Sequence, residues 1–132
     1  MNERIAIVPA GMEAVYEKIR YAPAVKVGNT IYVSGQICRD AAMEIIEGRE
    51  AQIVQAFENL KLVLEAAGAS MSDVIDLTTF HTDMRDLPLF MQVRDRYFMT
   101  DPLPAWTAVG AHMLGGTAGY IVEIKAVAIL QE

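Results

Sequence analysis

The sequence has few of the residues that would cross-link, metallate or anchor a fold. It contains a single cysteine, Cys38, so no disulfide can form within the chain. Its two histidines, His81 and His112, have no cysteine or carboxylate at ligand spacing, and we expect no metal site. We interpret both histidines as structural and Cys38 as an inert buried thiol. No apolar run approaches a membrane span and residues 1–5 show no signal sequence, so we expect a cytoplasmic protein without a membrane partner.

Positive charge is scarce as well. The chain carries 11 Lys and Arg residues against 17 Asp and Glu, a formal net charge of −6. Its densest basic group, Arg85, Arg94 and Arg96, is interleaved with aspartates. Because contacts to phosphates need clustered cations, this balance argues against a nucleic-acid partner.

Apolar residues, in contrast, are abundant. Of the 132 residues, 53% are hydrophobic and only 21% are charged. A chain of this length predicts a single domain over residues 1–132. Small domains expose a large share of their surface, so this composition is too apolar for a monomer. We therefore expect a homo-oligomer with a buried interface.

Hydrophobic periodicity predicts six strands and two helices. The expected strands cover 4–8, 21–27, 30–36, 74–82, 105–111 and 120–130, and the expected helices cover 49–67 and the segment between 86 and 101. Gly68 is a typical residue to end the first helix. We expect Asp86 to cap the second, with Pro88 in its first turn. Gly35 inside a strand indicates a bulge or the close approach of another group.

The order β-β-β-α-β-α-β-β predicts an α+β fold, in which both helices cover one face of a single mixed sheet. The last strand, 120–130, is apolar on both of its faces. A strand of this kind must be covered on both sides, and the chain supplies no further helix for the second side. The pattern therefore predicts subunits that pack sheet against sheet.

Two residues near the end of the chain have a double interpretation. Glu123 stands between Val122 and Ile124, where a carboxylate must find hydrogen-bond partners or become protonated. It is either a structural residue paired with Lys125 or with a neighbour's arginine, or an acid–base group at the floor of a pocket. Trp106 is either a packing residue or the wall of a ligand pocket.

Several segments resemble the YjgF/RidA family. In chain order they are YAPAVKVGN at 21–29, YVSGQ at 32–36, AFENLK at 56–61, LEAAG at 64–68, FHTDM at 80–84, Pro-Ala at 104–105 and Val-Glu-Ile at 122–124. The order and spacing match over about residues 20–130. The resemblance implies a chorismate mutase-like fold, in which three subunits pack their sheets into a central β-barrel and ligand clefts lie between neighbours.

For the deaminase members, the resemblance implies hydrolysis of reactive enamines and imines to ammonia and a 2-keto acid, with no cofactor. Tyr21 matches the tyrosine at the mouth of the cleft. Gly35 matches the glycine whose backbone contacts the ligand, and Phe80 matches an aromatic wall. Glu123 matches the glutamate that positions water.

One residue departs from the deaminase pattern. Those members have an arginine after Pro-Ala that holds the substrate carboxylate, and this chain has Trp106. An indole cannot hold a carboxylate bidentately, and losing such a pair costs on the order of 2–5 kcal/mol. We therefore expect weak or absent 2-iminobutanoate deaminase activity, as in a divergent, YjgH-like branch. Trp106 and the adjoining Thr107 become candidate substrate contacts that favour an uncharged or aromatic ligand.

Four functions stay open at this point. The first is a hydrolase in which Glu123 orients water and Tyr21 donates a hydrogen bond. The second is a non-catalytic metabolite sensor or carrier that uses the same cleft. A ribonuclease is disfavoured by the acidic balance, and the fourth is a scaffold with a vestigial cleft.

Overall fold

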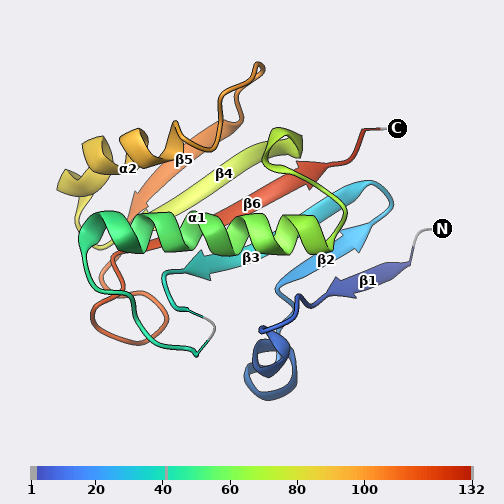
Figure 1. Ribbon diagram of the computed structural model, residues 1–132, viewed down its shortest axis with the longest axis horizontal. Helices are drawn as coiled ribbons and strands as arrows, with labels where there is room; N and C mark the ends of the chain where they lie inside the picture. The colour runs from blue at the N-terminus through green and yellow to red at the C-terminus, as the bar shows by residue number, and fades with distance from the viewer. Residues whose placement is uncertain (1–2, 41, 132) are drawn as a thin grey trace.

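A six-stranded sheet with two helices in front of it is the framework of the molecule (Figure 1). The computed structural model describes residues 3–40 and 42–131. Its elements are β1 (Arg4–Ile7), a π-helical turn (Val15–Ile19), β2 (Ala24–Val27), β3 (Thr30–Ile37), α1 (Arg49–Ala66), a 3-10 turn (Met71–Asp73), β4 (Val74–His81), a 3-10 turn (Met84–Asp86), α2 (Leu87–Arg94), β5 (Ala105–Gly110) and β6 (Val122–Ile129). The predicted α+β class and element order are confirmed.

The sheet order is β1-β2-β3-β6-β4-β5. The β4–β5 pair is parallel and the other neighbours are antiparallel, so the sheet is mixed as predicted. Both helices lie on the same face, with α1 across the middle strands and α2 beside β5 (Figure 1). No helix among the described residues is long and apolar enough to cross a membrane.

Strand β6 shows why the two faces of the sheet differ. Its even-numbered residues from Val122 to Ala128 are buried under the helices. The odd-numbered residues, Glu123 among them, point to the opposite face and are partly or fully exposed. That face also carries Tyr32, 50% exposed, and Ile129, 38% exposed. It is called the open face below, because no described helix covers it (Figure 1).

Helix α1 ends where the sequence predicts. The backbone N–H of Ala69 donates to the carbonyl of Leu64 at 2.8 Å, and Gly68 adopts a φ of +84°. This is a Schellman motif, in which the left-handed residue after the helix is usually glycine. The turn brings the chain back to the sheet at β4.

The predicted capping of α2 by Asp86 is wrong. Asp86 is the residue before the helix, and Pro88 does lie in the first turn, but the carboxylate does not bond the helix backbone. It accepts two hydrogen bonds from the guanidinium of Arg49, at 2.8 and 3.1 Å. Asp83 instead caps the preceding turn by accepting from the N–H of Arg85 at 3.0 Å. Asp86 therefore joins the start of α2 to the start of α1.

Candidate functional site

A β-bulge in β3 forms one side of the candidate site. The pairing of β3 with β6 skips Ser34 and Gly35. The N–H and the hydroxyl of Ser34 donate to the carbonyls of residues 23 and 22, at 2.9 and 2.7 Å. Bulges redirect a strand locally and occur often beside functional sites. Here the bulge brings the backbone of Gly35 against the side chain of Glu123.

Gly35 leaves room for the carboxyl group that lies over it. A Cβ added at this position would meet a carboxylate oxygen of Glu123 and stand 2.6 Å from Cδ and 2.8 Å from Cγ. Atoms that are not bonded do not approach so closely. The predicted bulge and the predicted close approach at Gly35 are therefore both present, and the approaching group is the side chain of Glu123.

Glu123 is partly buried and makes no hydrogen bond or ion pair within residues 3–40 and 42–131. Its cross-strand partners are Phe80 on β4 and Ile37 on β3. Burial raises the pKa of the Glu123 carboxyl, because desolvation penalises the charged form. The structural alternative of an ion pair with Lys125 is absent, and the open face presents a carboxyl group beside an aromatic ring.

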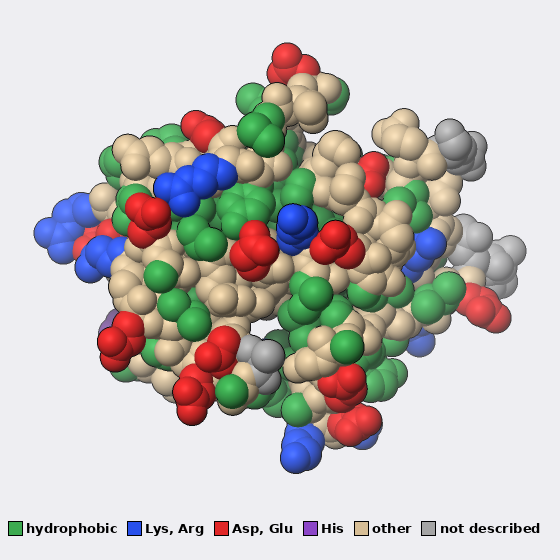
Figure 2. All heavy atoms as spheres, in the orientation of Figure 1, with side chains coloured by type: hydrophobic (Ala, Val, Ile, Leu, Met, Phe, Trp, Pro, Cys, Tyr) green, Lys and Arg blue, Asp and Glu red, His purple; other side chains and the backbone are tan. Residues whose placement is uncertain are grey.

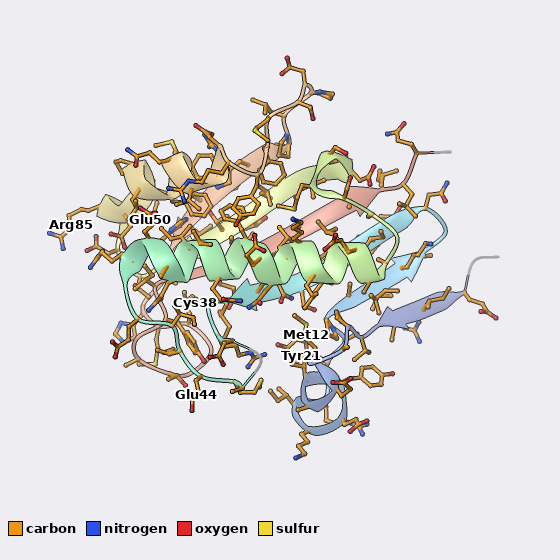
Figure 3. All side chains as sticks on the ribbon, in the orientation of Figure 1. Met12, Tyr21, Cys38, Glu44, Glu50 and Arg85 are labelled. Carbon is orange, nitrogen blue, oxygen red and sulfur yellow. The ribbon has the colours of Figure 1, made fainter. Side chains whose placement is uncertain are left out.

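A cavity of about 160 Å³ lies between α1, the bulge and the N-terminal turn. Tyr21, Gly35, Arg39 and Asn59 are among its lining residues. Figure 2 shows the surface hollowed below α1, and Figure 3 shows Met12 and Tyr21 between the helix and the N-terminal turn. The guanidinium of Arg39 donates to the hydroxyl of Tyr21 at 3.2 Å. Gly35 thus belongs to both the cavity and the contact with Glu123.

Trp106 lies on the helix-covered side of the sheet, away from Glu123 and from the cavity lined by Tyr21. Its indole N–H donates to the hydroxyl of Thr79 at 2.8 Å. Its ring stacks on Phe90 with centroids 5.6 Å apart, and the guanidinium carbon of Arg94 lies 5.0 Å from the ring centroid. Within its own chain Trp106 therefore packs α2 against the sheet.

Thr107 and Phe80 lie on the same face of the sheet as Glu123. Thr107 is exposed on the edge strand β5, paired with Thr78 of β4. Phe80 is partly buried beside Ile37 and is the direct cross-strand partner of Glu123. The structure thus brings Gly35, Glu123 and Phe80 together, and it leaves Trp106 on the opposite face.

Of the remaining reactive side chains, His81 and Cys38 are buried and hydrogen-bonded. His81 is 1% exposed, and its Nε2 lies 2.8 Å from the hydroxyl of Thr79. Burial lowers the pKa of His81, which favours the neutral ring. Cys38 donates to the side-chain oxygen of Gln52 at 2.8 Å, and burial raises the pKa of its thiol. His112 is exposed in the loop after β5. The described residues contain no cluster of three or more His, Cys, Asp or Glu that could hold a metal ion.

Sequence reasoning missed Arg39 and Asn59. Asn59 lies on α1, and its side-chain amide donates to the carbonyls of Ile37 and Arg39 at 2.9 Å each. Only the position of Arg39, three residues after the Ser-Gly-Gln bulge segment, could have indicated that its side chain is near Gly35. Periodicity gives no signal here, because Arg39 follows the end of β3.

These elements define an α+β protein with an uncovered sheet face and a carboxyl group held over a bulge glycine. Residues 12–130 match the family described as endoribonuclease L-PSP. The RutC family protein YjgH of Escherichia coli is 38% identical over 133 residues, which covers 100% of this chain and 99% of that protein. A 2-iminobutanoate/2-iminopropanoate deaminase of Dermatophagoides farinae is 40% identical over 115 residues, which covers 84% of this chain and 86% of the deaminase.

The fold agrees with these relatives. A solved structure described as protein YJGH superposes with a TM-score of 0.88 at 38% identity, covering 98% of both chains. The chain therefore belongs to the endoribonuclease L-PSP family, also known as YjgF/RidA.

Proposed function

We propose that the protein is a cofactor-independent hydrolase of small imine or enamine metabolites. The observation that carries this proposal is the carboxyl group of Glu123, which is partly buried, free of partners in the described chain and held over the backbone of Gly35. A carboxyl group in this state can exchange protons with a bound water molecule. The named deaminase relative supports the choice of imines as substrate class.

The proposed reaction adds water across a carbon–nitrogen double bond. The Glu123 carboxylate takes a proton from water as the water oxygen attacks the imine carbon. Glu123 passes this proton to the imine nitrogen, which gives a neutral carbinolamine. Glu123 then takes the proton of the carbinolamine hydroxyl and passes it to the same nitrogen as the carbon–nitrogen bond breaks, so that ammonia leaves and a ketone remains. Tyr21 donates a hydrogen bond to the substrate, and Phe80 and Thr107 line the open face on which the reacting atoms lie.

A homotrimer completes the site in this proposal. The open face carries exposed apolar side chains such as Tyr32 and Ile129, and packing three such faces into a central barrel removes them from water. The clefts then lie between neighbours, and the edge strand β5 of one subunit contributes Thr107 to its neighbour's cleft. We place this trimer in the cytoplasm, with no nucleic-acid partner.

The absence of an arginine at position 106 predicts slow turnover of the smallest 2-imino acids. Trp106 is engaged with Thr79 and Phe90, so it offers no cation to a substrate carboxylate. The same absence supports the second candidate, a metabolite sensor or carrier that binds in the cleft without hydrolysis. The ribonuclease activity named in the family description is disfavoured by the net charge of −6.

Ammonia release from 2-aminoacrylate and 2-iminobutanoate, generated in situ, tests the proposal. We expect saturable turnover by the wild type, slower than that of the Dermatophagoides farinae deaminase measured beside it. Glu123→Gln keeps the shape of the side chain but cannot take a proton, so its rate should fall by about 10² to 10⁴. Glu65→Gln, at an exposed position of α1, is the matched control and should keep the wild-type rate. Saturable binding without turnover would identify the carrier instead.

A further inference from the structure

We propose that Arg39 and Tyr21 form a carboxylate-binding site in the cavity below α1, and that Arg39 supplies the cation that position 106 lacks. This inference deepens the proposed function. The binding of a carboxylate is argued from the cavity alone, and only its role in the reaction rests on the proposed function. The cavity is lined by residues of one chain, with apolar walls from Met12, Val15 and Leu62. Its volume of about 160 Å³ suits a small metabolite.

The backbone that carries Arg39 is fixed on both sides. The amide of Asn59 donates to the carbonyls of Ile37 and Arg39, at 2.9 Å each, and so ties this segment to α1. Arg39 also forms an isolated β-bridge with Ile45. An anchored backbone lowers the entropy lost when the guanidinium binds a ligand.

The guanidinium of Arg39 has N–H donors that no described residue uses. Among the described residues Arg4, Arg20 and Arg39 form no ion pair, and of these three only Arg39 lines the cavity. Its one side-chain bond goes to the hydroxyl of Tyr21 at 3.2 Å. A guanidinium has five N–H donors, so those left over can bind a carboxylate as a fork.

Tyr21 adds a second donor at the same place. Its hydroxyl oxygen accepts from Arg39, which leaves the hydroxyl proton free for an oxygen of the ligand. The acidic residue of the cavity, Asp40, has its Oδ1 turned to the loop, where it accepts from the N–H groups of Ala42 and Glu44 at 2.9 and 3.0 Å. The cavity therefore offers the guanidinium of Arg39 and the hydroxyl proton of Tyr21 to a ligand carboxylate, with the negative charge of Asp40 as the opposing group among its lining residues.

The position of Gly35 connects this site to Glu123. Gly35 lines the cavity and also lies under the carboxyl group of Glu123. Glu123 itself is not among the lining residues, so Gly35 is the residue that the cavity and the contact with the carboxyl group share. The inferred ligand is a small monocarboxylate, in place of the uncharged or aromatic ligand that Trp106 suggested, because Trp106 does not line this cavity.

Calorimetric titration with sodium 2-oxobutanoate and with the neutral 2-oxobutanamide tests the inference. We expect the wild type to bind the acid at least about tenfold more tightly than the amide, and Arg39→Gln to weaken binding of the acid by about 30-fold or more. Arg39→Lys should recover part of this loss, because it keeps the charge but not the fork. Tyr21→Phe should weaken binding of the acid by about tenfold or less, the loss of a single hydrogen bond.

Arg94→Gln is the matched control, since Arg94 is the arginine that stacks on Trp106. Equal affinity for the acid and the amide would overturn the inference. So would a loss of acid binding in Arg94→Gln together with full binding in Arg39→Gln. Circular dichroism of each variant shows whether it folds. If Arg39→Gln does not fold, the affinity of Arg39→Lys for the acid tests the inference instead.

The two proposals fail separately. Arg39-dependent binding of the acid without Glu123-dependent ammonia release would refute the hydrolase and leave this site in place. Glu123-dependent release that is indifferent to Arg39→Gln would refute this site and leave the hydrolase in place.

Discussion

Gly35 and Glu123 constrain each other. The glycine lacks the side chain that would collide with the carboxyl group, and the carboxyl group is held in a partly buried position where water stabilises its charge poorly. Carboxyl groups with perturbed pKa values are concentrated at functional sites, where the desolvation of the charged form serves the chemistry.

Gly35→Ala should destabilise the protein by about 1–3 kcal/mol, because the new methyl group overlaps the side chain of Glu123. The same substitution in a Glu123→Ser background should cost much less, since the overlapping atoms are gone. Urea unfolding of the four proteins in this double-mutant cycle measures the difference. Equal costs in both backgrounds would show that the contact is not what excludes a side chain at position 35.

Glu123→Gln should raise the melting temperature at neutral pH. Burial raises the pKa of the carboxyl, so the folded state keeps a proton that the unfolded chain has already released. The stability contributed by the protonated carboxyl is complete below its ordinary pKa and is lost as the pH rises through the raised value. Glutamine stays neutral, so the gain should vanish near pH 4. A wild type more stable than Glu123→Gln at pH 7, by calorimetry, would contradict this.

At the scale of elements, α2 is attached to the rest of the fold at two places. Asp86 joins its start to Arg49 of α1, and Phe90 stacks on Trp106 of β5. The indole also donates to Thr79, whose hydroxyl contacts the buried His81. Position 106 is therefore part of the packing between α2 and the sheet.

Trp106→Phe should keep the stacking and cost about 1 kcal/mol for the lost N–H donor. Trp106→Arg should cost about 2–4 kcal/mol, because it places a guanidinium against Phe90 and beside Arg94. Chemical denaturation of both variants measures these differences. A Trp106→Arg variant as stable as the wild type would show that residue 106 does not pack between α2 and the sheet.

The sequence predicted most of the elements, because their signals are local. The alternation of β6 and the glycine that ends α1 were both readable from periodicity and turn chemistry. The partner of Asp86 could not be predicted, because Arg49 is distant in the chain. An aspartate before a helix looks the same in the sequence whether it caps the helix or forms an ion pair. Arg39 was missed for a similar reason, because Tyr21, which accepts its hydrogen bond, is distant in the sequence and comes close only in the folded chain.

Alternation also left the side of Trp106 undetermined. It shows which residues of β5 share a face, but the face that meets the helices depends on how β5 pairs with β4. The parallel pairing of Trp106 with the buried Leu77 decides it.

At the scale of the whole molecule, the open face is the main unexplained surface of a single chain. We expect a solution mass near three times the 14.5 kDa of one chain by multi-angle light scattering. Tyr32→Glu should shift this mass toward the monomer, because it places a charge within the proposed interface. Met99→Glu, at a residue that is 80% exposed, should leave the mass unchanged. A monomeric wild type would contradict the trimer.

The central claim is that Glu123 is the proton-transferring group of a hydrolase. Ammonia release from 2-aminoacrylate by the wild type and by Glu123→Gln tests it most directly. We expect measurable release by the wild type and a rate lower by about 10² to 10⁴ in the variant, which should be folded and more thermostable at neutral pH. Equal release by both proteins would show that the carboxyl group over Gly35 does not carry the chemistry.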